Sequence, residues 1–450
     1  MPTRLYLDTA RLGLMSRSAQ QIHIDFVRFV GEEAGSLYFD QLLEKGTEDW
    51  PGSLRRRFPA LKAWRGVSHL KSGLKALAGA SPESHVLLAA RSAQLMKLAA
   101  ELLLCLCRKV MVTDLTWPSY RRILDQVQGA VDDRIIVLPL RKRILTDKLQ
   151  PGELVDLAVA HYLRHGCQGL FLPAVDNLGI RLPVQRIVRA IEAHAEVRFV
   201  VVDGAQALNH IPLDLDDPYC DLLLAGAHKW LRAYHPMGIG YYGHPRSVGF
   251  INKTIRRLQR RGFLDDPLVP FLCDQPSVGA FNHLGETVGV APLFSCQGAV
   301  DDANGAGLET ALSQRLANAD IVSSLLADRG WEPFRPAEKL RSGILLLRAV
   351  GKSIRSTNPQ TLRRRLHDVA VSVTSYPKGI VRISVPPEKW LQEELAHLLC
   401  ALVVTSNSWS LEPNDLKSKT RAKGNQSTAR RPWSTPLSTN NYSAVSPSAD

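Results

Sequence analysis

Six short apolar runs recur between residues 86 and 225, and segments long enough for a helix separate most of them. The runs are continuous rather than alternating in polarity, which is typical of strands that are buried on both faces. Such strands, spaced by helix-length segments, indicate a parallel sheet with crossover helices. The runs cover residues 86–89, 109–113, 135–138, 169–172, 197–202 and 221–225. The sequence therefore predicts an α/β fold with a mostly parallel central sheet and helices on both faces.

The pattern changes after about residue 305. Residues 343–350, 370–375 and 380–385 have strand character, whereas residues 359–367 and 388–404 have helical character, which predicts a small α+β domain. From about residue 406, Ser, Thr, Asn, Pro and Lys dominate, which predicts a disordered basic tail. We therefore expect an N-terminal segment and large domain over 1–304, a small domain over 305–405 and a tail over 406–450.

Two ionisable residues follow neighbouring apolar runs in the chain. Asp203 comes directly after residues 197–202, and Lys229 lies shortly after residues 221–225. Because ligands of parallel sheets bind at the carboxyl ends of the strands, we expect both side chains at one site. A lysine amine forms an imine with the aldehyde of pyridoxal phosphate (PLP), and a carboxylate pairs with its pyridinium nitrogen. The pair predicts a PLP site, although either motif alone also fits a strand that ends in a turn.

Three stretches around this pair resemble the class V aminotransferase family, the fold type I PLP enzymes that include cysteine desulfurases, kynureninase-like lyases and epimerases. They are Val200–Gln206, Ala227–Trp230 and Pro236–Tyr242, in the order and spacing of the family's aspartate, lysine and glycine motifs. The resemblance implies the PLP-dependent transferase fold, with Lys229 and Asp203 as catalytic residues that also bind the cofactor.

The resemblance also implies residues for the phosphate and the ring of the cofactor. Arg91, Ser92 and Ala93 are similar to the turn that holds the phosphate at a helix N-terminus. Arg91 replaces a small residue there, and Ser92 also fits an ordinary helix cap. Trp117 occupies the place of the aromatic ring that stacks on the cofactor, although it also fits a core position.

Further implied contacts lie at the phenolic oxygen and beside the phosphate. Asn177 resembles the asparagine that approaches the phenolic oxygen, with Asp176 as a close competitor because the loop is one residue shorter than common forms. Gln206 is the second donor to that oxygen in the family. His228 matches a histidine beside the phosphate.

Two more implied residues come from outside these motifs. The serine that often precedes the family's lysine is missing, since Gly226 and Ala227 stand there. Thr287 resembles the threonine that reaches the phosphate of the partner subunit, which implies a homodimer. Arg382 resembles the arginine that binds the substrate α-carboxylate, a contact suited to the guanidinium group.

These residues predict the cofactor, but several types of reaction are compatible with them. Cysteine desulfurases need a persulfide-forming cysteine shortly before the arginine segment, and no cysteine lies between Ala349 and Arg382. We therefore favour an aminotransferase acting on an amino acid or related amine. A lyase or epimerase of the same fold, or a catalytically inactive PLP-fold binding protein, remain alternatives.

Composition and charge limit the binding partners and the cell compartment that we expect. The formal charge of +13 comes largely from arginine runs, which more often form solvated faces or sites for anionic substrates than nucleic-acid surfaces. No run approaches the length of a membrane span. The seven cysteines are scattered and include no metal-type pair, so we expect a reducing cytoplasm and no metal.

Overall fold

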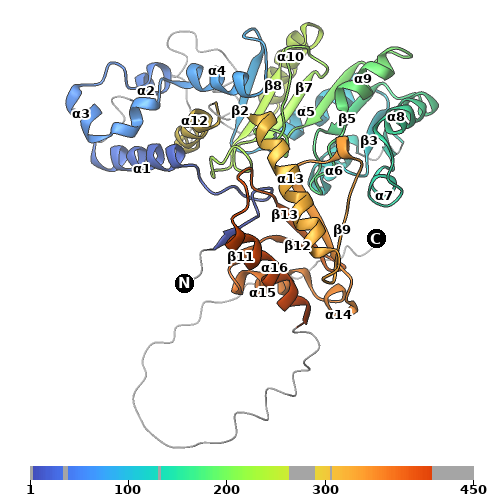
Figure 1. The fold of residues 1–450 in the computed structure, drawn as a ribbon. Helices are drawn as coiled ribbons and strands as arrows, with labels where there is room; N and C mark the ends of the chain where they lie inside the picture. The colour runs from blue at the N-terminus through green and yellow to red at the C-terminus, as the bar shows by residue number, and fades with distance from the viewer. Residues whose placement is uncertain (1–3, 34–38, 130–132, 263–288, 305–306, 408–450) are drawn as a thin grey trace, which may run out of the picture. The chain divides into compact units, whose positions relative to one another are not determined.

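The computed structural model describes residues 4–33, 39–129, 133–262, 289–304 and 307–407 (Figure 1). Its largest element is a seven-stranded sheet in which β8 alone runs antiparallel to its neighbours. The predicted α/β class with a mostly parallel sheet is thereby confirmed. The strand order is β2 (His85–Ala89), β8 (Gly238–Tyr242), β7 (Leu222–Gly226), β6 (Phe199–Asp203), β5 (Gly169–Pro173), β3 (Val110–Thr113), β4 (Ile135–Leu138).

Both faces of this sheet are buried. Side chains along β6 alternate between two hydrophobic cores, with Val200 and Val202 in one and Phe199 and Val201 in the other. This alternation explains why the runs are apolar at every position, since neither face of the strand meets water. The two cores hold the helices on the two faces of the sheet.

Helices fill most of the remaining described chain. Their bounds are α1 (Arg17–Glu32), α2 (Phe39–Lys45), α3 (Gly52–Arg57), α4 (Val67–Leu77), α5 (Ser92–Leu106), α6 (Pro118–Gln128), α7 (Arg141–Leu145), α8 (Pro151–His165), α9 (Val184–Glu192), α10 (Pro245–Arg260), α12 (Ala291–Asn304), α13 (Leu308–Leu326), α14 (Lys352–Arg355), α15 (Pro359–Asp368) and α16 (Gln392–Asn407), with 3-10 turns η2 (Pro59–Ala63) and η4 (Glu338–Leu340). None of these helices is both long and apolar enough to cross a membrane.

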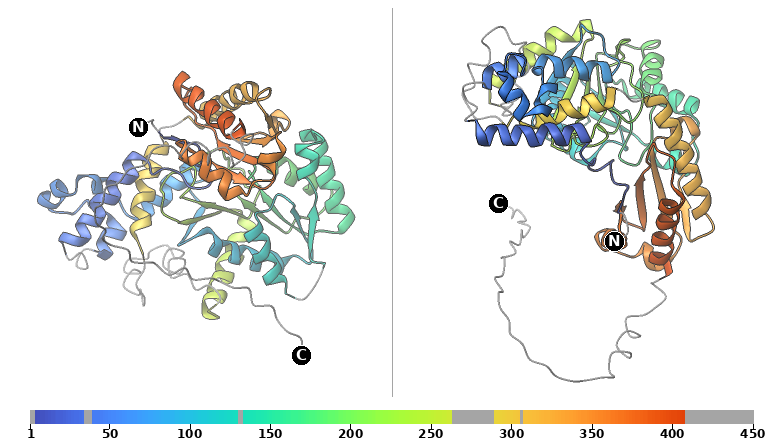
Figure 2. Two further views of the ribbon diagram at one scale, coloured as in Figure 1. Left: turned by 90° about the horizontal axis from the view of Figure 1, so that it is seen from below. Right: turned by 60° about the vertical axis from the view of Figure 1, so that its left-hand side comes forward.

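The C-terminal part contains a second, antiparallel sheet. Its strand order is β12 (Thr374–Tyr376), β13 (Ile380–Ser384), β10 (Ile344–Ala349), β9 (Trp331–Pro333). A separate pair joins β1 (Leu5–Tyr6) in parallel to β11 (Val371–Ser372), so the N-terminal strand lies beside the C-terminal part of the chain (Figure 2).

The strand expected over 370–375 is divided. Val373 separates β11 from β12, and the two pieces pair with different strands, β1 and β13. The division is invisible in the sequence because the partner of β11 lies more than 360 residues away in the chain. The domain boundaries at 304 and 405 stay predictions, and the pairing of β1 is a contact that crosses the first of them.

Candidate active site

Asp203 is the last residue of β6, and Lys229 lies three residues beyond the end of the neighbouring strand β7. Both side chains line a cavity of about 620 Å³ at this edge of the sheet. Asp203 is buried and its Oδ1 accepts a hydrogen bond of 2.9 Å from the Ala205 backbone. Burial raises the pKa of Asp203, while that hydrogen bond and the Lys229 charge oppose the rise.

The Lys229 amine is held in a partly buried position. Burial lowers its pKa to about 8; the Asp203 charge acts against this shift and the Arg382 charge adds to it. Among the residues that the structure describes, the amine forms neither an ion pair nor a hydrogen bond. A lowered pKa leaves a larger fraction of neutral amine near neutral pH, and the neutral amine is the nucleophile.

Helix α5 begins at the cavity. Ser92 and Ala93 line it, whereas the exposed Arg91 is not among its described lining residues. The Tyr120 hydroxyl, which also lines the cavity, donates a 2.8 Å hydrogen bond to Ser92 Oγ. A Cβ on Gly238 would lie 2.7 Å from Arg91 C and Ser92 N, so glycine is required where β8 passes under this turn. The sequence analysis missed Tyr120, whose spacing in α6 resembles that of any core aromatic residue.

Trp117 lines the same cavity and is 43% exposed. An indole in the core would be shielded on all sides, so the core alternative for this residue is wrong. Trp117 precedes α6 as its N-cap residue, and the proline that follows it opens the helix. The ring is thereby placed at the cavity by the start of a helix.

The loop after β5 brings both candidates for the phenolic oxygen to the cavity. The Asn177 amide donates to the Tyr376 hydroxyl at 3.3 Å. Asp176 Oδ1 accepts from the backbones of Leu178 and Ile180, while Oδ2 is buried without a partner. Burial raises the pKa of Asp176 to about 7. Of the two residues, Asp176 is the one with a polar side-chain atom that is buried without a partner.

Gln206 is held by the protein at both ends of its amide. Its Nε2 donates to the Ala10 carbonyl at 2.7 Å, and its Oε1 accepts from Trp230 Nε1 at 2.7 Å. Gln206 lines the cavity, and an amide nitrogen carries two hydrogens, so one remains for a ligand. The hydrogen bonds fix the amide in one orientation.

His228 lines the cavity next to Lys229, and its Nδ1 is buried without a partner. Burial, followed by the Lys229 charge, lowers the pKa of His228 to about 4, so the ring is neutral. A Cβ on Gly226 would lie 3.2 Å from the His228 ring, which is a tight contact. The ring therefore occupies space beside the position where the family often has a serine.

The four-stranded sheet supplies the opposite wall. Arg382 on β13 is 4% exposed and lines the cavity with Thr374 and Tyr376. Its guanidinium donates to Tyr376 Oη at 3.2 Å, to Thr374 Oγ1 at 3.3 Å and to Asp8 Oδ1 at 3.4 Å. Asp8 is also buried, and it accepts from Thr374 Oγ1 at 2.5 Å. A buried carboxylate thus contacts Arg382, whose binding of the substrate carboxylate stays a prediction from the resemblance.

The N-terminal segment completes this wall, and the sequence analysis missed it. Ala10 and Arg11 line the cavity, and the Ala10 backbone donates to Ser384 Oγ at 2.8 Å. The Gly13 backbone donates to the His228 carbonyl at 2.8 Å, and a Cβ on Gly13 would lie 2.1 Å from the Lys229 carbonyl oxygen. A two-residue strand has almost no periodic signal, so the sequence pattern around β1 did not indicate this contact.

Neither Thr287 nor a cysteine is among the described residues that line the cavity. Thr287 falls outside the described residues. Cys296 lies in α12, and none of the described cysteines lines the cavity. The nineteen described residues that line the cavity therefore include no thiol.

Comparisons with known proteins show a likeness to the class V aminotransferases over part of the chain. Residues 143–248 match the model of the class-V aminotransferases. A probable cysteine desulfurase of Haemophilus influenzae is 40% identical over 108 residues, 24% of this chain and 22% of its own length. The isopenicillin N epimerase of Streptomyces clavuligerus is 30% identical over 155 residues, covering 34% of this chain and 35% of its own. These sequence matches thus span only about a quarter to a third of the relatives' lengths.

Solved structures extend the likeness to the whole fold. A C-DES variant with glycine covalently linked to the PLP cofactor has a TM-score of 0.65 at 13% identity, over 89% of this chain and 97% of its own. The cysteine desulfurase CsdA of Escherichia coli has a TM-score of 0.64 at 16% identity, over 90% and 95%. The ureidoglycine-glyoxylate aminotransferase of Bacillus subtilis has a TM-score of 0.62 at 13% identity, over 92% and 95%. The chain therefore has the PLP-dependent fold type I, and its residues 143–248 are similar to the class V aminotransferases, in agreement with the resemblance of its motifs.

Proposed function

We propose that the protein is a PLP-dependent aminotransferase that acts on an amino acid or a related amine. The observation that carries this proposal is the pair Asp203 and Lys229, which the ends of β6 and β7 bring into one cavity. A buried carboxylate and an amine of lowered pKa are the two groups that PLP requires from a protein.

The residues around the cavity fit PLP. Its volume of about 620 Å³ lies in the range of small-molecule sites. Lys229 would hold the aldehyde carbon, Asp203 the ring nitrogen, and Ser92 with the N-terminus of α5 the phosphate. Trp117 offers a flat apolar face to the ring. Unpartnered atoms of Asp176 and His228 leave polar capacity that a ligand can satisfy.

Lys229, Arg382 and Asp203 have different roles in the proposed reaction. When bound, PLP supplies an electron-withdrawing ring that stabilises negative charge on the substrate Cα. Lys229 is placed to remove and return a proton at that carbon as a general base. Arg382 is placed to fix the substrate carboxylate, which decides which Cα bond faces the reactive amine. Asp203 keeps a negative charge beside the ring nitrogen and thereby favours its protonated form.

The reaction type is tested by products. The PLP-loaded protein is mixed with a panel of amino acids without a keto-acid acceptor, and the cofactor and products are separated by chromatography. Formation of pyridoxamine phosphate with one equivalent of keto acid supports an aminotransferase. Continuing keto-acid release with PLP unchanged indicates a lyase, loss of optical purity alone indicates an epimerase, and no reaction indicates a binding protein.

Attachment of the cofactor is tested separately from turnover. Borohydride reduction of the protein with PLP should add a pyridoxyl group to the peptide that contains Lys229. Label on another lysine contradicts the site. A Cys296→Ala variant of unchanged activity would add to the evidence against a desulfurase mechanism, because that thiol is buried in α12 away from the cavity.

We also propose a homodimer in a reducing cytoplasm. Gly226 and Ala227 leave the phosphate without the serine that often precedes the lysine, which supports a donor from the partner subunit through Thr287. The described cysteines are free thiols, as a reducing compartment favours. Sedimentation of the active protein as a monomer would rule out the shared site.

A further inference from the structure

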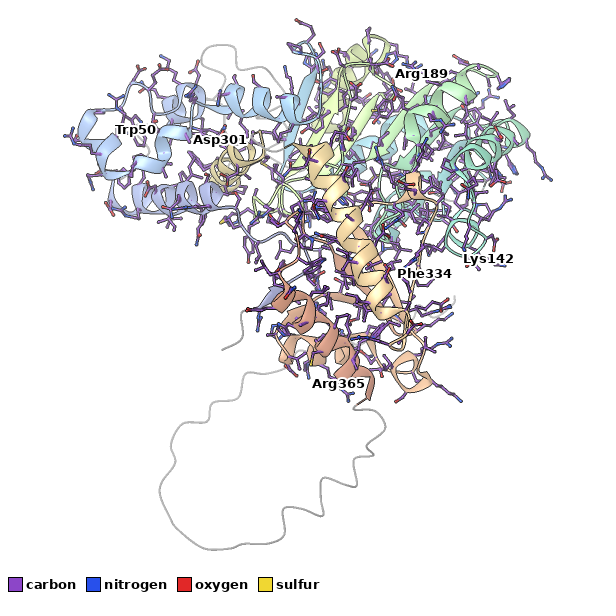
Figure 3. The ribbon with its side chains drawn as sticks, in the orientation of Figure 1. Trp50, Lys142, Arg189, Asp301, Phe334 and Arg365 are labelled. Carbon is purple, nitrogen blue, oxygen red and sulfur yellow. The ribbon has the colours of Figure 1, made fainter. Side chains whose placement is uncertain are left out.

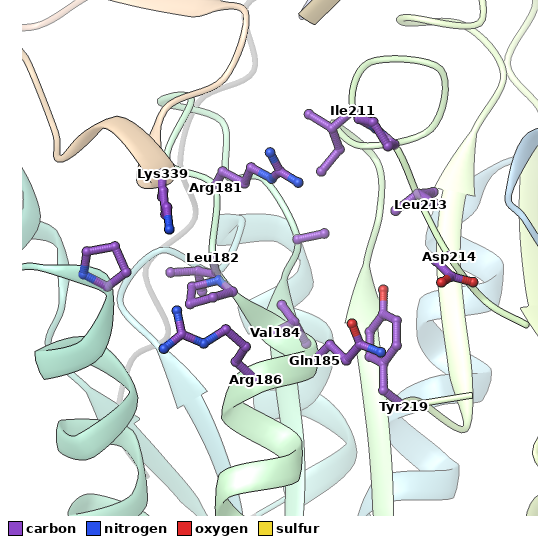
Figure 4. A pocket seen from close by; sticks show the side chains of 14 residues that line it. Arg181, Leu182, Val184, Gln185, Arg186, Ile211, Leu213, Asp214, Tyr219 and Lys339 are labelled. Carbon is purple, nitrogen blue, oxygen red and sulfur yellow. The ribbon is translucent and has the colours of Figure 1, made fainter. Parts of the chain in front are cut away.

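A second cavity, of about 420 Å³, lies at the start of α9, and its described lining shares no residue with the first cavity. Its apolar part includes Leu182, Val184 and Ile211, each 4% exposed (Figure 4). These apolar side chains are almost fully buried, and all three line the cavity. The cavity is therefore preformed and offers an apolar surface to a ligand.

Three cations line this cavity from three separate places. Arg181 follows the loop after β5, Arg186 lies in the first turn of α9, and Lys339 lies in η4. Within the described chain, none of the three side chains forms an ion pair or a hydrogen bond. By contrast, Arg189, on the same helix, pairs with Asp217 and Glu192.

One acidic residue, Asp214, lines the same cavity. The lining therefore carries three positive charges and one negative charge, a formal net charge of +2. Asp217, three residues beyond Asp214, is paired with Arg189 and is not among the lining residues, so it does not offset this excess. An anion in the cavity would balance it.

Tyr219 adds a neutral donor. The side chain is 8% exposed, its hydroxyl has no hydrogen-bond partner in the described part of the chain, and Figure 4 shows it directed into the cavity. Burial raises the pKa of Tyr219, so the hydroxyl stays protonated. The first turn of α9 also lacks a side-chain cap, since its N-cap residue is Pro183. Its backbone N–H groups are thus available to an acceptor.

We propose that this second cavity binds a small organic anion, a carboxylate or a phosphate ester on an apolar body. The cations, the Tyr219 hydroxyl and the helix N-terminus all favour a negatively charged acceptor. Inorganic phosphate would leave the apolar surface of Leu182, Val184 and Ile211 in contact with water. A neutral apolar molecule would leave the cations unbalanced. The inference does not rest on the proposed aminotransferase activity.

Calorimetric titration of the PLP-loaded full chain tests this site with four probes. Benzoate and phenyl phosphate combine an anion with an apolar body, benzamide keeps the body without the charge, and inorganic phosphate keeps the charge without the body. We expect benzoate or phenyl phosphate to bind at least tenfold more tightly than benzamide and inorganic phosphate. The tighter of the two identifies the head group. Equal binding of benzamide, or no binding of either organic anion, overturns the proposal.

Variants locate the binding site. Arg181→Gln combined with Lys339→Gln should weaken binding about tenfold or more, and Tyr219→Phe, which keeps the packing, should weaken it by a smaller factor. Arg189→Gln is the matched control because this arginine lies on α9 but outside the lining (Figure 3). Unchanged affinity in the double variant and in Tyr219→Phe overturns the proposal. So does loss of binding in Arg382→Gln, because the anion would then occupy the first cavity.

Discussion

The first cavity has two walls that are built in different ways. One wall consists of residues at strand ends of the seven-stranded sheet, with Asp203 and Lys229 at its centre. The other consists of the N-terminal segment and the four-stranded sheet, with Arg382 held by Asp8. We call them the sheet wall and the clamp wall.

The two walls differ in how their residues are positioned. On the sheet wall, each side chain follows a strand whose pairing fixes the backbone, as the register between Asp203 and Leu224 shows. On the clamp wall, contacts such as that from the Ala10 backbone to Ser384 Oγ join residues 374 positions apart in the chain. Under the proposed function, the chemistry depends on the sheet wall and substrate recognition on the clamp wall.

The largest expected effect belongs to Lys229. Lys229→Ala should reduce turnover by roughly 10²- to 10⁴-fold, because it removes both the nucleophile and the general base of the sheet wall. Turnover is measured with an excess of PLP so that weaker binding does not obscure the step. Lys142→Ala on α7 is the control, since Lys142 lies outside the cavity lining (Figure 3). A variant that retains more than a tenth of the activity would remove Lys229 from the mechanism.

Asp203→Asn is expected to have the next largest effect. The neutral amide no longer favours a protonated ring nitrogen, so exchange of the substrate Cα proton should slow by about 10²-fold or more. The amide keeps the size of the carboxylate, so PLP should still bind. Exchange is followed by NMR in deuterated water. An unimpaired rate would show that the sheet wall acts without this charge.

The two walls also differ in how far the sequence predicted them. Asp203, Lys229 and Trp117 follow continuous apolar runs, and those runs are a local signal because both faces of the sheet are buried. Asp8 and Arg11 follow a strand of two residues whose partner lies in the C-terminal part of the chain. No local pattern encodes such a pairing, so the sequence analysis found Arg382 only through its resemblance to a family motif.

Residues that make their contacts through side chains were predicted least well. Asn177 was preferred to Asp176, and this preference stays a prediction because both residues line the cavity. Tyr120 reaches Ser92 from α6, and the helical spacing of Tyr120 is the same as that of a core residue. Side-chain direction depends on the geometry of a loop or helix in space, which residue type and spacing do not specify.

The clamp wall should affect recognition rather than chemistry. Asp8→Asn should raise KM about ten- to a hundredfold and leave kcat nearly unchanged, because Arg382 loses the buried carboxylate that positions it. Arg363→Gln is the matched control, since Arg363 is a half-exposed second partner of Asp8, at 3.5 Å. Steady-state kinetics with the preferred amino acid separates the two constants. A fall in kcat with unchanged KM would mean that the clamp wall acts in the chemical step, and the division of roles would be wrong.

The smallest expected effect is on the pH dependence of stability. It tests the free-energy cost of burying the Lys229 amine, and it needs no measurement of turnover. Burial lowers the pKa of Lys229 from its ordinary value near 10.5 to about 8 in the folded protein. Between these two values the unfolded chain binds more protons than the folded one, so this group makes the free energy of unfolding rise as pH rises from about 8 to 10.5. Partial exposure screens the charge, which limits the change to about 1–2 kcal/mol.

Lys229→Met removes the charge, so without PLP it should be more stable than the wild-type protein at pH 7. The difference should shrink as pH approaches 10.5, while tyrosines and cysteines titrate alike in both proteins. Urea unfolding of the two proteins across this range measures the difference directly. A constant difference would mean that the Lys229 amine is not desolvated, and the sheet wall would then lack the feature that makes this lysine a nucleophile.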